Sequence, residues 1–142
     1  YNMEEDFAVE VAPARTFCFL SEIEMLKEQG LIKGGGLDNA LVIVDKKIDQ
    51  IEINRLRHLF GIEETIIQGA NGILNGKLLR FKNEPVRHKT LDLIGDLALL
   101  GTPITGHVTA ARAGHASNVE FVKKLKRVYA KELEELWEDE NN

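Results

Sequence analysis

Residues 83–100 read NEPVRHKTLDLIGDLALL, and this stretch has the clearest structural pattern in the chain. Asn83 can cap a helix, Pro85 suits a first helical turn, and Gly101 followed by Pro103 stops a helix. Apolar side chains cover almost every direction around such a helix. The stretch therefore predicts a helix that is buried in the protein.

Strands and shorter helices are expected on both sides of this helix. We predict a strand at 7–12 that runs into 14–17, a helix from Ser21 to Gly30, a strand at 39–45, weak helical character at 53–60, turns at 71–72 and 75–76, a strand at 104–111, and a last helix capped by Ser117 or Asn118 that ends near Trp137. The sum is a mixed α/β (α+β) fold without an internal repeat.

Composition narrows the class of protein. The 142 residues are 44% hydrophobic and 29% charged, which suits one buried core. A net charge of −5 argues against nucleic-acid binding, and no apolar run approaches the roughly 18 residues of a membrane span. The single cysteine, Cys18, favours a reducing compartment, so we expect a cytoplasmic protein. Because Tyr1 is not a natural start residue, we expect a fragment of a longer protein.

Three polar side chains interrupt the apolar helix at one-turn intervals. His88, Asp92 and Asp96 are each four residues apart, so they project from one side of the helix. An ionised carboxylate in an apolar setting is costly unless it is paired or binds a cation. A histidine and a carboxylate at this spacing suit zinc. A buried ion-pair network, or a more solvated helix end, is the alternative interpretation.

A second histidine follows a glycine further along the chain. Gly114 permits close approach of backbone or substrate, and His115 could serve as a general acid or base whose tautomer Asp96 fixes. From the residues alone, His115 could equally be a third metal ligand or a surface histidine. His58 and His107 lack such a pattern, and we interpret both as structural or exposed.

Four segments in order resemble a known family. These are ARTF at 14–17, GGGLDNA at 34–40, HKTLDLIGDL at 88–97 and AGHASN at 113–118. Together they resemble the signature of the UDP-3-O-acyl-N-acetylglucosamine deacetylases. The resemblance implies the second, carboxyl-terminal half of a two-domain enzyme, over residues 1–138 and incomplete at its amino-terminal side. It implies a two-layer sandwich of sheet and helices with a βαβ insert at about 17–45, and a linker or tail at 139–142.

The resemblance also implies a reaction and its residues. The family hydrolyses the N-acetyl group of UDP-3-O-(3-hydroxyacyl)-N-acetylglucosamine with zinc, in the committed step of lipid A biosynthesis. Zn²⁺ would be bound by His88 and Asp92. Thr16 would donate its hydroxyl to the developing oxyanion. His115 would act as a protonated imidazole with Asp96 as its partner.

Substrate contacts are implied in the same way. Lys89 and Arg112 resemble the positive groups that face the diphosphate and sugar, although the family often has lysine at the second position. Phe17 and Phe19 resemble an apolar wall beside the sugar. The resemblance places the acyl-chain tunnel at Leu20, Ile23, Ile32, Leu37, Ala40 and Val42. Gly35 and Gly114 are two further substrate-binding positions. Without the resemblance, ordinary core is the simpler interpretation of the aliphatic residues.

The chain departs from the family pattern in three ways. Cys18 stands where the family commonly has glycine. The long stretch 46–83 resembles the form that is fused to a 3-hydroxyacyl-carrier-protein dehydratase, with 136–142 leading toward that domain. No Glu-His pair is present, although the family takes its third zinc ligand and its general base from such a pair in the amino-terminal domain.

We therefore expect this chain alone to be inactive and to need that domain as a partner. Two other classes of function remain as alternatives. One is a metal-free scaffold or interaction domain of a bifunctional protein. The other is a nucleotide-binding module built on 34–36, which is weak because three glycines without a phosphate-loop pattern usually form a turn.

Overall fold

The computed structural model describes residues 1–2, 4–63 and 66–140, and its side chains as far as residue 132. The chain divides into two compact units. The sheet unit is Ala8–His88, and the helical unit combines 1–7 with 89–142. The boundary falls inside one helix, between His88 and Lys89.

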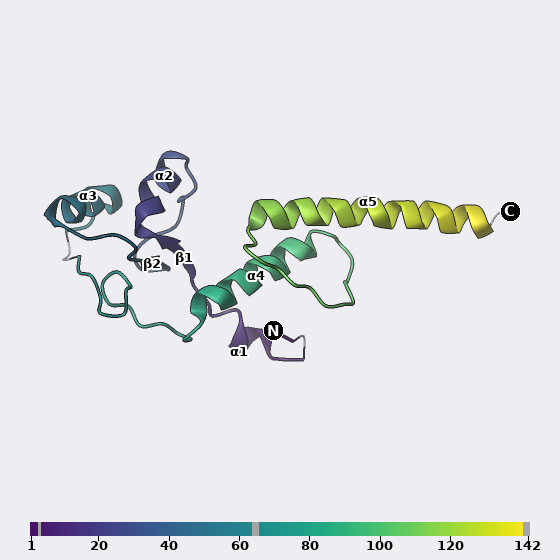
Figure 1. Ribbon diagram of the computed structural model, residues 1–142, viewed down its shortest axis with the longest axis horizontal. Coiled ribbons are helices and arrows are strands. Elements are labelled where there is room, and N and C mark those ends of the chain that lie inside the picture. The colour runs from purple at the N-terminus through teal and green to yellow at the C-terminus, as the bar shows by residue number, and fades with distance from the viewer. Residues whose placement is uncertain (3, 64–65, 141–142) are drawn as a thin grey trace. The chain divides into compact units, whose positions relative to one another are not determined.

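The sheet unit contains a small βαβ arrangement. Strand β1 (Thr16–Phe19) pairs in parallel with β2 (Ala40–Ile43), with Thr16 opposite Ala40 and Phe19 opposite Ile43. The 3₁₀ helix η1 (Leu20–Glu22) and helix α2 (Ile23–Glu28) make the crossover that parallel strands require (Figure 1). The strand, helix and strand predicted for this region are confirmed, although Ser21 caps no helix and its hydroxyl instead donates to Asp45.

Helix α3 (Gln50–Phe60) follows β2 and is longer than the predicted segment 53–60. It begins where the Asp49 carboxylate accepts a hydrogen bond from the Glu52 amide, and it ends at Gly61, which has a φ of 63°. The predicted turns at 71–72 and 75–76 are confirmed, because Gly72, Asn75 and Gly76 all have positive φ.

One hydrophobic core holds the sheet unit together. Partly buried side chains from α3 and from the loops surround it. Its buried members are Leu20, Ile23, Val42, Leu56, Ile66 and Leu74. The core therefore fixes the strand pair against α2 and α3.

The strand predicted at 7–12 is wrong. Residues Phe7–Glu10 form the short helix α1, and extended structure begins only at Thr16. Apolar, β-prone residues form a strand only where a neighbouring strand satisfies their backbone groups. Among the described residues, β1 pairs with β2 alone.

The helical unit contains most of α4 (Glu84–Ala98) and all of α5 (His115–Glu140). Both helices are labelled in Figure 1. The prediction that α4 is buried is wrong: Glu84 is its one fully buried residue, and Val86 is 64% exposed. An apolar helix is buried only where other layers cover it on all sides. Within the described residues, α5 is the one other long helix of this unit.

The strand predicted at 104–111 is also wrong, because these residues form an exposed, irregular connection. Their alternating pattern has no strand to pair with in the described residues of this unit. The last helix begins earlier than predicted, at His115, since the Ser117 hydroxyl bonds back to Gly114 and thereby lies inside the first turn.

The mixed helix and parallel-strand content agrees with the predicted α/β class. The sandwich, the two-domain division and the domain limits 1–138 stay predictions. Helix α5 extends through Glu140, and residues 141–142 of the predicted tail lie outside the described residues. None of the described helices is both long and apolar enough to cross a membrane.

Candidate active site

A buried ion pair ties the start of β1 to the start of α4 within the sheet unit. Glu84 is 0% exposed. Its Oε1 accepts from Arg15 Nε at 2.8 Å and its Oε2 accepts from Arg15 Nη2 at 3.0 Å, so the guanidinium binds through two nitrogens. The backbone amides of Arg15 and Arg80 also donate to this carboxylate, at 3.0 and 2.7 Å.

These contacts keep Glu84 ionised. Burial opposes ionisation, but the hydrogen bonds from Arg15 and from the Arg80 amide outweigh it and lower the pKa of Glu84 from 4.5 to about 2. The sequence prediction missed this cluster. The usable signal was a glutamate in the first turn of the helix, a position that the helix dipole alone is enough to explain.

His88 lies one turn beyond Glu84 on the same helix. Its Nδ1 is 3.3 Å from the carbonyl oxygen of Ala14, and its ring makes an edge contact with Phe17 at 6.2 Å between centroids. The Ala14 carbonyl accepts a hydrogen bond when Nδ1 carries the proton, which leaves the lone pair on Nε2. Thr16, two residues after Ala14, is exposed at the first position of β1.

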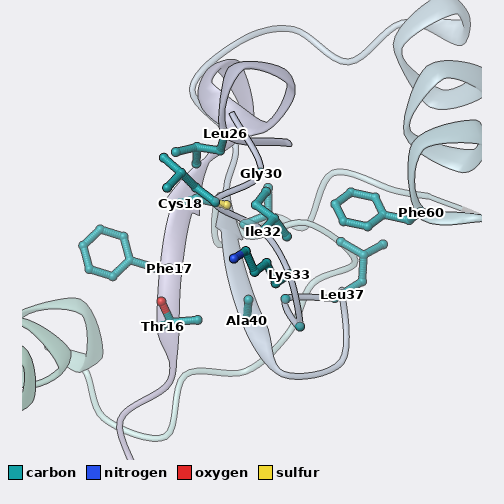
Figure 2. Close-up of a pocket in the computed structure, with 15 residues that line it drawn as sticks. Thr16, Phe17, Cys18, Leu26, Gly30, Ile32, Lys33, Leu37, Ala40 and Phe60 are labelled. Atoms are coloured by element: carbon teal, nitrogen blue, oxygen red, sulfur yellow. The ribbon is translucent and has the colours of Figure 1, made fainter. Parts of the chain in front are cut away.

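A pocket of about 460 Å³ opens beside the two strands. Its lining includes Phe60 of α3 and the loop that follows α2 (Figure 2). Seven of the residues predicted for substrate or oxyanion line it: Thr16, Phe17, Ile32, Gly35, Leu37, Ala40 and Val42. Of the other predicted substrate residues of the sheet unit, Leu20 and Ile23 are buried in the core, and Phe19 does not line the pocket.

Other residues of the lining were not predicted. They are Cys18, Leu26, Gly30, Leu31, Lys33, Gly34, Gly36 and Phe60. Cys18 lies two positions after Thr16, so strand alternation was a usable signal for it. Burial, and then the nearby Glu22, raise the pKa of the Cys18 thiol. Lys33 is the charged residue of an otherwise largely apolar lining.

The helical unit brings together the other predicted catalytic residues. His115 Nδ1 lies 3.0 and 2.9 Å from the two carboxylate oxygens of Asp96. Asn118, which is buried, donates its side-chain amide to Asp96 Oδ2 at 2.8 Å. His115 Nε2 lies 3.8 Å from Asp92 Oδ1. The first turn of α5 therefore faces the carboxylates of α4.

Exposure differs among these groups. The side chains of Asp92 and Asp96 are 11% and 12% exposed, whereas that of His115 is 69% exposed. Lys89 Nζ lies 3.4 Å from Asp92 Oδ2. A held histidine on an accessible surface can exchange protons with a bound substrate. The sequence prediction offered Asn118 as a helix cap and did not anticipate its bond to Asp96.

The two remaining predicted substrate residues, Arg112 and Gly114, lie just before His115 in the sequence. Arg112 is exposed and has a φ of 53°, which is uncommon for a residue other than glycine. Gly114 donates its amide to Ser117 Oγ at 3.1 Å and so belongs to the start of α5. Among the residues that the structure describes, no three histidine, cysteine or acidic side chains form a group that could hold a metal ion.

Comparison with known proteins assigns the chain to a family of deacetylases. The family model described as "UDP-3-O-acyl N-acetylglycosamine deacetylase" (LpxC) matches residues 1–60 and 46–127. The chain belongs to this family.

Curated relatives agree with this assignment. The "Bifunctional enzyme LpxC/FabZ" of Chlorobaculum tepidum is 54% identical over 128 residues, which cover 89% of this chain and 27% of that protein. The protein of the same name in Porphyromonas gingivalis is 44% identical over 92% of this chain and 27% of its own length. The "UDP-3-O-acyl-N-acetylglucosamine deacetylase" of Chlamydia pneumoniae is 44% identical over 122 residues, which cover 86% of this chain and 34% of that protein. The chain thus spans about a quarter to a third of these relatives.

Proposed function

We propose that this chain contributes the carboxyl-terminal part of a zinc-dependent deacetylase that hydrolyses the N-acetyl group of UDP-3-O-(3-hydroxyacyl)-N-acetylglucosamine in lipid A biosynthesis. Membership of the deacetylase family supports the reaction class. The single structural observation that carries the proposal is the histidine–carboxylate pair of His115 and Asp96, held by Asn118 next to Asp92. Such a pair is suited to proton transfer during amide cleavage.

His88 and Asp92, on successive turns of α4, would hold the zinc ion. The contact of His88 Nδ1 with a backbone carbonyl fits this role, since metal-bound histidines usually donate their other ring nitrogen to such a group. The low exposure of Asp92 also suits a ligand. Zn²⁺ bound there would polarise the amide carbonyl and make water a stronger nucleophile.

Two protein ligands are too few for a catalytic zinc site, which normally has three. We propose that a further histidine ligand and a glutamate general base come from an amino-terminal domain outside this chain. The chain by itself should then be inactive.

His115 would supply a proton to the substrate. Because Asp96 accepts a hydrogen bond from Nδ1, the proton that the imidazole ring can give to the substrate is the one on Nε2. The protonated ring stabilises the negative oxygen of the tetrahedral intermediate or protonates the leaving amine. Asn118 donates a hydrogen bond to the same Asp96 oxygen that contacts His115, so Asn118 orients the histidine–carboxylate pair.

The sheet unit would bind the rest of the substrate. Thr16, an exposed residue of the pocket lining, would donate its hydroxyl to the oxyanion. The largely apolar pocket receives the acyl chain, and Phe17 lies beside the sugar. The cationic side chains of Lys89 and Arg112, from the helical unit, neutralise the diphosphate. Leu20, Ile23 and Phe19 contribute indirectly, by supporting the strands.

Fusion to a dehydratase is a further part of the proposal. The Chlorobaculum tepidum and Porphyromonas gingivalis relatives are both named as bifunctional LpxC/FabZ enzymes. We propose that the full-length protein resembles them and acts in the cytoplasm.

The test is acetate release from the acylated UDP-sugar by the full-length protein. His115→Gln should lower kcat by roughly 10²- to 10⁴-fold, the usual contribution of a general acid. His58→Gln, at an exposed position of α3, is the matched control and should keep full activity. Unchanged turnover with His115→Gln would refute the assignment of the acid.

A further inference from the structure

The carboxylate of Glu84 accepts hydrogen bonds from two segments that are far apart in the sequence. Arg15 precedes β1, whereas Arg80 lies in the loop before α4. The same two arginines make further bonds between these segments, because Arg15 Nη2 donates to the Leu78 carbonyl at 2.7 Å and Arg80 Nη1 donates to the Pro13 carbonyl at 2.6 Å. Residues 13–15 are therefore bound to residues 78–84 through the Glu84 carboxylate and through two backbone carbonyls.

This cluster lies directly beside two of the proposed functional groups. Arg15 is followed in the chain by Thr16, and Glu84 is one helical turn before His88. Ala14 is held as well, since its carbonyl contacts His88 Nδ1 at 3.3 Å. Consecutive residues of one segment thus bind helix α4 through Glu84 and His88, immediately before the threonine.

We propose that Glu84 is a positioning residue that sets Thr16 and His88 in register for the reaction by tying the start of β1 to the first turn of α4. The proposal rests on the proposed function, since it assumes that these two residues act on substrate and metal. Stability alone does not require such a pair, because apolar residues of similar volume often replace buried ion pairs without loss. A bidentate pair adds direction, and a displacement of about 1 Å can cost two orders of magnitude in rate.

A second ion pair of the sheet unit provides the matched control. Arg87 Nη1 donates to Glu10 Oε2 at 2.5 Å and to the Glu10 carbonyl at 2.5 Å. This pair also links helix α4 to the segment before β1. It differs from the Glu84 pair because it ends at α1 and not beside Thr16.

The experiment compares Glu84→Gln with Glu10→Gln in the full-length deacetylase. We expect Glu84→Gln to lower kcat by about tenfold or more while KM changes by less than about twofold, because the oxyanion contact acts in the transition state. In the metal-free protein, NMR should show shifts of the His88 ring nitrogens and of the Thr16 amide. Glu10→Gln should lower the melting temperature only.

Arg15→Lys is a second variant for the case in which Glu84→Gln is unfolded at the assay temperature. Lysine keeps the charge but lacks the two-nitrogen geometry, so kcat and the NMR signals should change in the same direction. Unchanged kcat, or equal losses in Glu10→Gln, would overturn the positioning role. Full activity of His115→Gln or of His88→Ala would instead refute the proposed function, so the two failures are distinguishable.

Discussion

His115 Nδ1 lies 2.9 Å from Asp96 Oδ2, and the side-chain amide of Asn118 donates to that same oxygen. The carboxylate is thus held from α5 by two groups three residues apart. A carboxylate acceptor on Nδ1 fixes which ring nitrogen faces the substrate. This relationship leads to the first prediction.

Asp96→Asn should reduce deacetylation by roughly 10²- to 10⁴-fold, because an amide at this position lets His115 adopt the wrong tautomer. Folding should be preserved, since asparagine has nearly the same shape. The control is Glu120→Gln, which removes an exposed carboxylate of α5 that bonds Lys123. The prediction is contradicted if both variants retain the same kcat.

The Glu84 carboxylate should make stability depend on pH in the acid range. Its pKa is about 2 in the folded protein against 4.5 ordinarily, so the unfolded chain binds more protons between these values. The stabilisation is complete above pH 4.5 and is lost as the pH falls toward about 2. A pKa difference of this size corresponds to about 3 kcal/mol.

Urea unfolding at a series of pH values between about 2 and 6 measures this contribution. Glu84→Gln should be less stable than the native chain at neutral pH and should lack most of this dependence. Glu10→Gln should retain it, because Glu84 is unchanged in that variant. A native chain whose stability is flat across the range would show that Glu84 is not held ionised.

Filling the pocket should change which acyl chains the enzyme accepts. Ala40 lies on β2 within the lining, so Ala40→Phe should raise KM for long-chain substrates by about tenfold while short-chain substrates are affected less. Met25→Phe adds bulk on the exposed side of α2 and serves as the control. Equal effects of Ala40→Phe on both substrates would argue that the chain binds elsewhere.

Local signals in the sequence predicted the βαβ segment and the α4 helix well. The turn glycines, the apolar run at 39–45 and the stop at Gly101 each depend on near neighbours. The predictions of strands at 7–12 and 104–111 were wrong because they depend on residues that are distant in the sequence. A strand depends on a partner strand, and pairing partners cannot be deduced from an alternating pattern alone.

The candidate site divides in a similar way. Helical spacing and the family motifs pointed to His88, Asp92, Asp96 and His115, and the structure brings the last three together in one unit. Glu84 was missed because its guanidinium partner, Arg15, lies 69 residues away in the sequence and meets it only through the tertiary fold. The family resemblance placed Leu20 and Ile23 in the acyl-chain tunnel, whereas their apolar character alone favoured ordinary core, and both side chains are buried in the core.

The metal content of the purified full-length protein tests the central claim most directly. The native protein should contain about one zinc per chain, and His88→Ala should lose most of the zinc together with deacetylation. His107→Ala, at an exposed position of the 104–111 connection, should keep both. A His88→Ala protein that retains its full zinc content and turnover would contradict the account.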